Sequence, residues 1–438
     1  MNQVYNNEEK NIVLEISDDG YNAYLTIDKP EEFINESDII KLIEQSGIKY
    51  GIDAAKQFLE EKGFVKEYGV PFPIAIGTIA KEPEVEFSPL FDQEKSYNNT
   101  IGNQFYLLEG LNKITKGEPL AHLFVTKPAK PGINIFGDEV ETQSSEKILI
   151  SQYIGENVEY EHDRGQIIAT ESGYPWIDDL GRINIKSHFV IDEEINIDYE
   201  NFYLFGSLTI KGSVSDGANL KIDGDLYIEK DVEDSTINCT GNIKVFGNIL
   251  NCKQEGITAE GDIIFNNAEN SRLACGGKIS FEKNVHFCKL MAEKGVYGDE
   301  ENSSIVGGVI QSGEHIEAAI IGNASMMNTE AEISISPFTK EKMLQLTKQI
   351  MKMREYEKTD TTEFLKMTEQ LQELEDKLEY EINRALRNDD MVPKHILAFK
   401  KIFPGVYIRI LKKSLNITES LERVSYSIVN NQLIAEEY

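Results

Sequence analysis

The sequence predicts a mainly β protein built around a parallel β-helix, and two repeating patterns support this fold class. Glycine-marked units such as GSLTIKGSV and GDLYIEKDV recur with apolar residues at alternate positions. Their spacings are 18, 17, 20, 16, 18 and 18 residues, from starts at Gly206, Gly224, Gly241, Gly261, Gly277, Gly295 and Gly313. A fixed period of this length is typical of a β-solenoid, in which each coil buries its apolar side against the next coil. An antiparallel sandwich, the competing fold, does not require near-equal spacing.

A second motif lies between the glycine-marked units and reads ANLKID, STINCT, EGITAE, SRLACG and CKLMAE. Its alternation predicts one inward column, formed by Ile222, Cys239, Ala259, Cys275 and Ala292. Cys239 and Cys275 then lie two rungs apart, as do Cys252 and Cys288. Rungs are spaced by about 4.8 Å, so each pair is roughly 10 Å apart, beyond disulfide reach. We therefore expect free, buried thiols.

Residues 1–99 predict a small α+β domain. Residues 12–27 alternate between apolar and polar types around Asp19-Gly20, which indicates a hairpin. The segments ESDIIKLIEQSG and IDAAKQFLEEKG have helical spacing, and Gly47 can end the first helix.

Residues 100–186 predict a β-rich domain punctuated by glycine and proline. We expect its glycines to occupy turns with positive φ, and these are Gly132, Gly137, Gly155, Gly165 and Gly173. The loop KPAKPG lacks the clustered glycines and following helix of a phosphate-binding loop. The β-helix is expected over residues 187–336.

Residues 337–390 predict two helices in a coiled-coil hairpin, because apolar residues step by three and four in two charged segments. The seam comprises Leu346, Ile350, Met353, Leu371, Leu374, Leu378 and Ile382. A pair of surface helices packed on the solenoid is the alternative. Residues 391–438 return to strand alternation and are expected to cap or extend the β-helix, whose open end would otherwise be a bare sheet edge.

The charge of the chain argues against two classes of partner. The 44 basic and 75 acidic residues of the 438 give a net charge of -31. Such a surface repels phosphate backbones and anionic lipid heads, so we expect no nucleic-acid binding. The sequence also has no apolar run long enough for membrane insertion and no N-terminal signal pattern, so we expect a cytoplasmic protein.

Motifs that carry chemistry are missing from the sequence. It has no phosphate loop, dinucleotide fingerprint, zincin motif or nucleophile elbow. The six histidines, at positions 122, 162, 188, 286, 315 and 395, are scattered without local spacing suited to a metal. We therefore predict no catalytic residue, no cofactor and no metal. A β-helix enzyme acting on acidic sugars would need paired carboxylates in a groove, and the corner acids Asp223, Asp225, Asp231 and Asp234 are more simply explained as solvated.

The segment 394–413 is basic in an otherwise acidic protein. It includes Lys394, Lys400, Lys401 and Arg409. Docking of an acidic partner, docking of the acidic N-terminal half of the chain, and simple charge balance on strand edges all remain open.

Segments along nearly the whole chain resemble the FapA (flagellar assembly protein A) family of bacterial proteins. The resemblance is carried by ISDDGYNAYLTI, GIKYGIDAAKQFLEEKG with IAIGT, KGEPLAHLFVTKPAKPGINIFGDEV, GENVEYEHDRGQIIATESGYP, GGVIQSGEHIEAAIIGNAS and FPGVYIRI. The solenoid units are also similar to the C-terminal domain of the division inhibitor MinC and to the bactofilins. The segment IAKEPEVEF departs from the family pattern.

The resemblance implies a right-handed parallel β-helix with an N-terminal α+β domain and a coiled-coil helical hairpin. It also implies a role in flagellar assembly or in placing cell-envelope machinery, through contacts with other proteins. Our first hypothesis is accordingly a non-enzymatic scaffold or adaptor. A self-assembling, bactofilin-like cytoskeletal protein and a β-helix carbohydrate-active enzyme are the alternatives, and homo-oligomerisation stays open.

Overall fold

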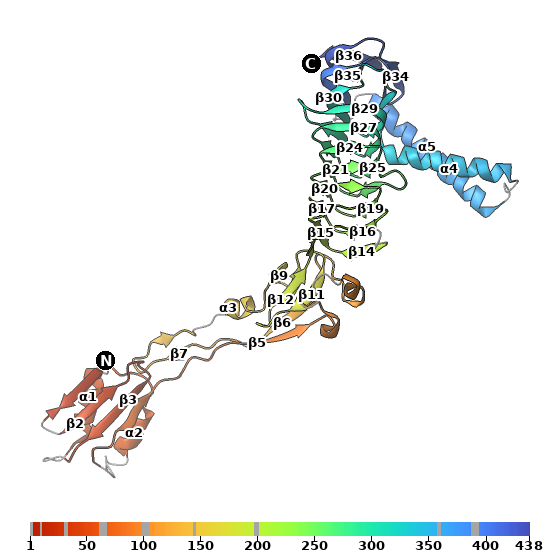
Figure 1. Cartoon of the computed structure of the whole chain (residues 1–438). Helices are drawn as coiled ribbons and strands as arrows, with labels where there is room; N and C mark the ends of the chain where they lie inside the picture. Colours follow the sequence, from red (N-terminus) through yellow and green to blue (C-terminus); the bar gives the residue numbers. More distant parts are fainter. Residues whose placement is uncertain are drawn as a thin grey trace. The chain divides into compact units, whose positions relative to one another are not determined.

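The computed structural model (Figure 1) describes residues 3–8, 11–29, 34–60, 68–98, 105–142, 146–196, 201–356, 361–386 and 394–438. The chain forms two compact units. Unit 1 comprises residues 1–96, 115–171 and 175–185. Unit 2 comprises residues 97–114, 172–174 and 186–438. The boundary expected at 99/100 lies outside the described residues, and segment 97–114 belongs with the solenoid rather than with unit 1.

Unit 1 begins with an antiparallel sheet packed against two helices. The sheet has the order β1 (Gln3–Asn7), β2 (Ile12–Ile16), β3 (Asn22–Ile27) and β4 (Phe72–Ile76), and the helices are α1 (Glu36–Ser46) and α2 (Asp53–Glu60). The alternation of β2 and β3 buries one side of the sheet against Ile39 and Leu42 of α1. A capping box between Asn35 and Asp38 starts α1, and Gly47 ends it with a φ of 77°. The predicted hairpin and helix end are confirmed.

A second antiparallel sheet follows in unit 1, in the order β5 (Glu84–Pro89), β6 (Pro119–Lys127), β10 (Gln166–Ala169) and β9 (Val158–Glu161). Shorter elements lie outside this sheet: η2 (Gln93–Lys95), α3 (Glu146–Ser151), and two separate two-stranded sheets, β7 (Gly132–Ile133) with β8 (Glu139–Val140) and β11 (Tyr174–Ile177) with β12 (Ile183–Lys186). Of the five glycines expected at positive φ, only Gly137 and Gly165 adopt it. The expectation is wrong for the others; at Gly155 the constraint is space, since a Cβ would lie 2.1 Å from the Asn184 side chain.

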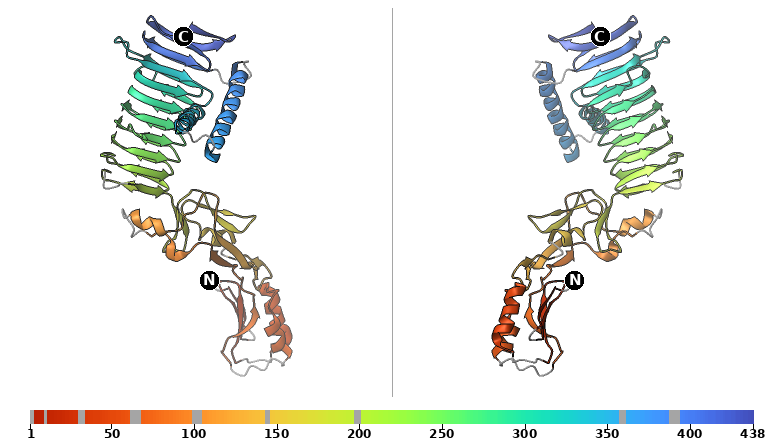
Figure 2. Two further views of the ribbon diagram at one scale, coloured as in Figure 1. Left: turned by 90° about the vertical axis from the view of Figure 1, so that its right-hand side faces the viewer. Right: turned by 90° about the vertical axis from the view of Figure 1, so that its left-hand side faces the viewer.

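Unit 2 is dominated by a 24-stranded sheet wound into a parallel β-solenoid (Figures 1 and 2). Its strands stack in three columns, which we name the first, second and third faces. The first face contains β13 (His188–Ile191), β15 (Ser207–Ile210), β17 (Leu226–Ile228), β20 (Ile243–Val245), β23 (Ile263–Phe265), β26 (Ile279–Phe281), β28 (Gly295–Gly298), β30 (His315–Ile321) and β32 (His395–Ile402).

The second face contains β14 (Phe202–Phe205), β16 (Asn219–Asp223), β19 (Thr236–Cys239), β22 (Ile257–Ala259), β25 (Arg272–Cys275), β27 (Asn284–Ala292), β29 (Ser304–Ser312), β31 (Thr329–Ile333) and β33 (Val406–Ile410). The third face contains β18 (Val232–Glu233), β21 (Asn248–Leu250), β24 (Asn267–Glu269), the first halves of β27 and β29, and the last residues of β30 and β32.

Parallel pairing along the faces confirms the predicted solenoid and rules out the sandwich. On the second face the inward residues pair rung over rung in the expected order: Ile222, Cys239, Ala259, Cys275 and Ala292. All five are buried. The backbone N–H and C=O groups of each coil form hydrogen bonds with the coils above and below it, because the strands of one coil pair with those of its neighbours.

Both ends of the solenoid are covered by other parts of unit 2. At the first rung, Tyr97 and Tyr174 pack edge-on against Phe189, and Tyr174 also contacts Phe205. Segment 97–114 includes η3 (Phe105–Gly110). At the last rung, antiparallel strands follow the parallel ones: β34 (Lys413–Asn416) pairs with β33, β35 (Leu421–Val429) with β32, and β36 (Gln432–Glu437) with β35.

A helical hairpin is inserted between β31 and β32. It consists of α4 (Pro337–Glu355) and α5 (Thr362–Leu386), which pack against each other and stand out from the side of the solenoid (Figures 1 and 2). The hairpin end expected at residue 390 lies outside the described residues. Despite the insertion, β30 still pairs with β32 and β31 with β33. Among the described residues, no helix is long and apolar enough to cross a membrane.

Candidate interaction arm and the sites around it

The base of the hairpin is fixed to the second face by charged side chains. Glu341, on the first turns of α4, accepts hydrogen bonds from Arg272 at 3.1 and 3.2 Å and from Lys289 at 2.7 Å. Lys340 forms an ion pair with Glu332 of β31. The side chain of Glu341 is only 16 % exposed, so these contacts are partly shielded from solvent. Charge-assisted bonds in such surroundings position a helix more firmly than exposed pairs do.

The helix start is also tied to the solenoid. Ser336 caps α4 by accepting a hydrogen bond from the Thr339 backbone N–H, and its hydroxyl donates to Glu293 at 2.7 Å. The same carboxylate accepts from the Phe338 N–H at 3.3 Å. A carboxylate at a helix N-terminus satisfies free N–H groups and complements the helix dipole. These contacts fix the direction in which the helical hairpin, which we call the arm, leaves the solenoid.

Apolar residues on the outer side of the second face mark where the arm docks. Most outward positions there are polar, for example Asn238 and Thr258, but Ala274 and Met291 are outward and buried. α4 contacts the strand that carries Met291. The sequence contained this signal as two apolar residues at outward positions of neighbouring rungs.

The predicted seam residues are buried to different extents. Leu346 and Ile350 of α4 are buried, and Met353 is half-buried. On α5 the seam residues are all half-buried, and no residue of that helix with a described side chain is fully buried: Leu371, Leu374, Leu378 and Ile382. The first turns of α4 contact the solenoid and the two helices pack against each other, and the coiled-coil seam stays a prediction.

Large apolar side chains remain exposed on the hairpin. Met351 and Tyr356 are 57 % and 66 % exposed, and Leu365 and Tyr380 are 61 % and 70 % exposed. An open hollow of about 520 Å³ lies on the second face beside the helix start, bordered by Lys221, Asn238, Thr258, Glu260 and Phe338 among others. Apolar side chains, among them Ala274 and Phe338, line it together with the polar ones, and its open form is that of a surface depression.

Backbone hydrogen bonds join four of the seven repeat glycines in one corner column, and the other three have different backbone partners. The backbone N–H groups of Gly241, Gly261 and Gly277 each donate to the glycine one rung below, beginning at Gly224. Gly206 starts the series with a φ of 117° and bonds to Asp223. The column continues through Lys294 and Glu314, so Gly295 and Gly313 are each displaced from it by one residue.

The corner acids are engaged in ladders between rungs. The Asp225 carboxylate accepts from the Asn242 backbone and side-chain amides at 2.7 and 3.0 Å, and Asp231 accepts from Asn248 at 2.7 and 2.9 Å. Asp223 accepts from the Tyr203 hydroxyl at 2.6 Å. Such ladders stabilise stacked coils. These contacts do not form the paired catalytic carboxylates in a groove that a carbohydrate-active enzyme would need.

The four cysteines are free and buried, as predicted. Burial raises the pKa of Cys239 and Cys275 to about 12 and that of Cys252 and Cys288 to about 11. Thiols of this kind are poor nucleophiles and poor metal ligands, because both roles require the thiolate.

Two histidines that looked unrelated in the sequence face each other on the first face. His315 of β30 and His395 of β32 are direct strand partners, and their Nδ1 atoms are 3.1 Å apart. The His395 Nε2 is 2.8 Å from Glu317 Oε1. Sequence spacing missed this cluster, since the two histidines are 80 positions apart and only the rung register unites them.

The basic segment 394–413 has partners within unit 2. Lys394 donates to the Gly313 carbonyl at 2.5 Å, and Lys412 lies 3.4 Å from Glu379 of α5. Arg409 lies 3.8 Å from Glu332, at the base of the arm. These contacts favour charge balance within the unit over docking of the N-terminal half.

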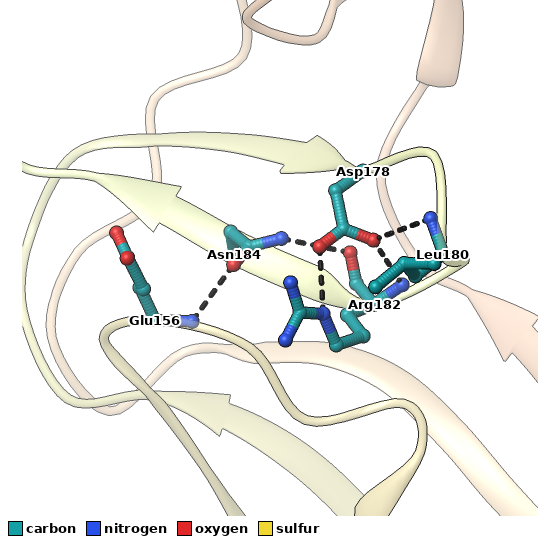
Figure 3. A network of polar contacts seen from close by, with 5 residues as sticks. All are labelled: Glu156, Asp178, Leu180, Arg182 and Asn184. Atoms are coloured by element: carbon teal, nitrogen blue, oxygen red, sulfur yellow. Dashed lines mark hydrogen bonds and ion pairs between the residues drawn. The ribbon is translucent and has the colours of Figure 1, made fainter.

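A polar network in unit 1 shapes the turn between β11 and β12 (Figure 3). Asp178 accepts from the Leu180 and Arg182 backbone N–H groups and pairs with the Arg182 Nε at 2.7 Å. Burial acts to raise the pKa of Asp178, but the bonds from Arg182 and Leu180 outweigh it and lower that pKa. Asn184 accepts from the Glu156 N–H at 2.8 Å, so the network orders loops.

Comparisons with known proteins cover both units. The model of the Flagellar Assembly Protein A N-terminal region matches residues 12–180, and the model of the Flagellar Assembly Protein A beta solenoid domain matches residues 187–433. No curated protein and no solved structure matches the chain. Because the two family models together span nearly the whole chain, the protein belongs to the FapA, or Flagellar Assembly Protein A, family.

Proposed function

We propose that the protein is a non-enzymatic cytoplasmic scaffold or adaptor, which acts in flagellar assembly or in placing cell-envelope machinery by binding other proteins. The observation that carries this proposal is the hairpin, which is fixed at its base and exposes apolar side chains farther along. The family is one of flagellar assembly proteins; the adaptor role is our inference from the arm.

The anchoring of the arm supports recognition of a protein surface. Glu341 and Ser336 fix the start of α4 to the solenoid, so little conformational entropy would be lost there on binding. Exposed Leu365 and Tyr380 on α5 offer aromatic and aliphatic anchors of the type that dominate helix-mediated contacts.

The covered ends of the solenoid weigh against a bactofilin-like filament. Polymerisation by stacking needs free strand edges at both ends. Here β34, β35 and β36 follow the last rung, and Tyr97 and Tyr174 pack at the first. The scaffold therefore remains the better-supported function.

A deletion tests the proposal most directly. Residues 338–390 are replaced by a short glycine-serine linker, and partners of the full-length and deleted chains are captured by cross-linking in the native cell. We expect loss of the specific partners and of the flagellar phenotype. Unchanged partners and phenotype would refute recognition through the arm.

Point variants separate loss of the surface from loss of the arm. Leu365→Glu and Tyr380→Glu should weaken capture, whereas Phe246→Glu on the solenoid, where the ring is 53 % exposed, should not. Light scattering over a wide concentration range tests the filament alternative, for which mass would rise continuously with concentration.

A further inference from the structure

The strand register of the first face brings together His315, Glu317 and His395. His315 and Glu317 are two residues apart on β30 and so project from the same side of the strand. His395 lies directly beside His315 on the next rung. One possible ligand atom from each residue lies within 4.8 Å of the others.

The hydrogen bonds of the cluster orient the two rings. Glu317 can only accept, so the His395 Nε2 at 2.8 Å carries the proton of that bond. The His395 Nδ1 then presents a lone pair toward the His315 Nδ1, 3.1 Å away. A carboxylate that holds one ring nitrogen while the other faces a common point is the arrangement that orients histidine ligands in metal sites.

We propose that His315 and His395, together with Glu317, bind one divalent transition-metal cation, for which Zn²⁺ serves as the probe. The cation would take the position between the two Nδ1 atoms. The proton now shared there would move, through solvent, to the Nε2 of His315, so neutral imidazole is the ligand and no net proton is released. Glu317 either binds the cation or keeps His395 in the required tautomer.

The observed distances fit this coordination. With Zn–N bonds of about 2.0–2.1 Å, two nitrogens of a tetrahedral site lie roughly 3.3 Å apart, close to the 3.1 Å between the two Nδ1 atoms. The side chains of His395 and Glu317 are 24 % and 21 % exposed, which leaves access for the ion and for water ligands. Two imidazoles select zinc, copper or nickel over magnesium and calcium.

The surroundings are compatible with a bound cation. Glu314 lies near the cluster, and the ring of Tyr297 stands 6.3 Å from that of His315. The nearby cation, Lys394, is turned to the Gly313 carbonyl. Competition from the four thiols is weak because they are buried and held in the neutral form.

A cation at this position would have a structural consequence. His315 lies in the rung before the hairpin and His395 in the rung after it, 80 positions later. One ion would therefore join the two chain segments that flank the insertion and hold the last rung, at β32, to the rung before it, at β30.

Titration of the full-length protein with zinc chloride tests the proposal. A chromophoric chelator as competitor gives affinity and stoichiometry. We expect one Zn²⁺ per chain, at least a tenfold loss of affinity for His315→Ala and for His395→Ala, and a loss of about 10–100-fold for Glu317→Gln. His286→Ala, on β27 away from the cluster, should bind as the wild type does.

A second measurement guards against variants that fold poorly. Zinc should raise the Tm of the wild type and of His286→Ala, and magnesium should not. The Tm of Glu317→Gln, the most conservative change, should respond only at higher zinc concentration. The proposal is overturned if the wild type shows no saturable zinc uptake, or if a folded His315→Ala/His395→Ala double variant takes up zinc equally well.

Discussion

Adding one methyl group to the glycine column tests the stacking on which the fold depends. In Gly241→Ala the new Cβ would lie 2.5 Å from the Gly224 carbonyl oxygen, 2.7 Å from its carbon and 2.4 Å from the Asp225 Oδ1. Two of these atoms belong to the backbone and cannot rotate away. Because the backbone of Gly241 does not have positive φ, any loss of stability reports crowding and not dihedral strain.

The expected loss follows from what must move. Ordinary contact begins near 3.4 Å, so the rungs must part by about 1 Å at this corner. That movement weakens the bond from the Gly241 N–H to the Gly224 carbonyl, 2.9 Å, and the bond from the Asn242 N–H to Asp225, 2.7 Å. Overpacking and weakened hydrogen bonds together should lower the free energy of unfolding by about 2–4 kcal/mol.

Thermal unfolding followed by far-UV circular dichroism measures this effect. For a unit of this size, 2–4 kcal/mol corresponds to a fall in Tm of about 4–16 °C. Hydrogen exchange should show the loss concentrated in β17, β20 and β23, since repeat proteins distribute stability between neighbours. Gly110→Ala is the matched control, because nothing lies within 4 Å of its Cβ. If the two variants unfold within about 0.5 kcal/mol of each other, the stacking argument is wrong.

Two further substitutions and one labelling experiment test other contacts. Glu341→Gln leaves Arg272 and Lys289 without their anion and should destabilise the docked base of α4 by about 1–2 kcal/mol, seen as faster hydrogen exchange in α4 alone. The four thiols should not react with a disulfide reagent at pH 8 until the protein unfolds. Their folded pKa values of about 11–12 exceed the ordinary 9.0, so their contribution to the free energy of unfolding should fall as the pH rises above 9. Asp178 has a lowered pKa, so its contribution to stability is present above pH 3.8 and is lost as the pH falls through the folded value. The fluorescence of Trp176 should therefore change with acid, and Asp178→Asn should remove that change.

Each of these three has a result that would contradict it. Equal exchange in α4 of Glu341→Gln and of Glu355→Gln, an exposed position at the far end of the helix, would show that the ion pairs do not hold the arm. Rapid labelling of native thiols would contradict their burial. An unchanged acid transition in Asp178→Asn would place the relevant protonation elsewhere.

The solenoid could be predicted from the sequence because every coil has the same packing requirement. Each coil needs an apolar inward residue every second position and small residues at its corners, so Ile222, Cys239 and Ala259 recur visibly. The displaced Gly295 and Gly313 show the limit of this reasoning. The regular spacing of these two glycines gave no sign that the hydrogen-bonded backbone column passes one residue away from each of them, through Lys294 and Glu314.

Contacts between distant segments could not be predicted in the same way. Segment 97–114 contributes Tyr97 to the first rung, although nothing in its local pattern distinguishes it from the β-rich region that follows. The histidine cluster depends on a register that resumes after the hairpin, and that register is set by pairing of β30 with β32. The apolar outward residues Ala274 and Met291 gave a local sign of where α4 docks.

The resumed register has a consequence for how the arm is held. β30 pairs with β32 and β31 with β33 in the same parallel sense as every earlier rung, so both ends of the insertion are set by the solenoid itself. A change in the arm can reach the cap by shifting these pairings or through the contact between Glu379 of α5 and Lys412. The contacts that resist such a shift are Glu332, shared by Lys340 and Arg409, and the facing pair His315 and His395. A ligand that bound this pair would therefore stiffen the base of the arm without touching it.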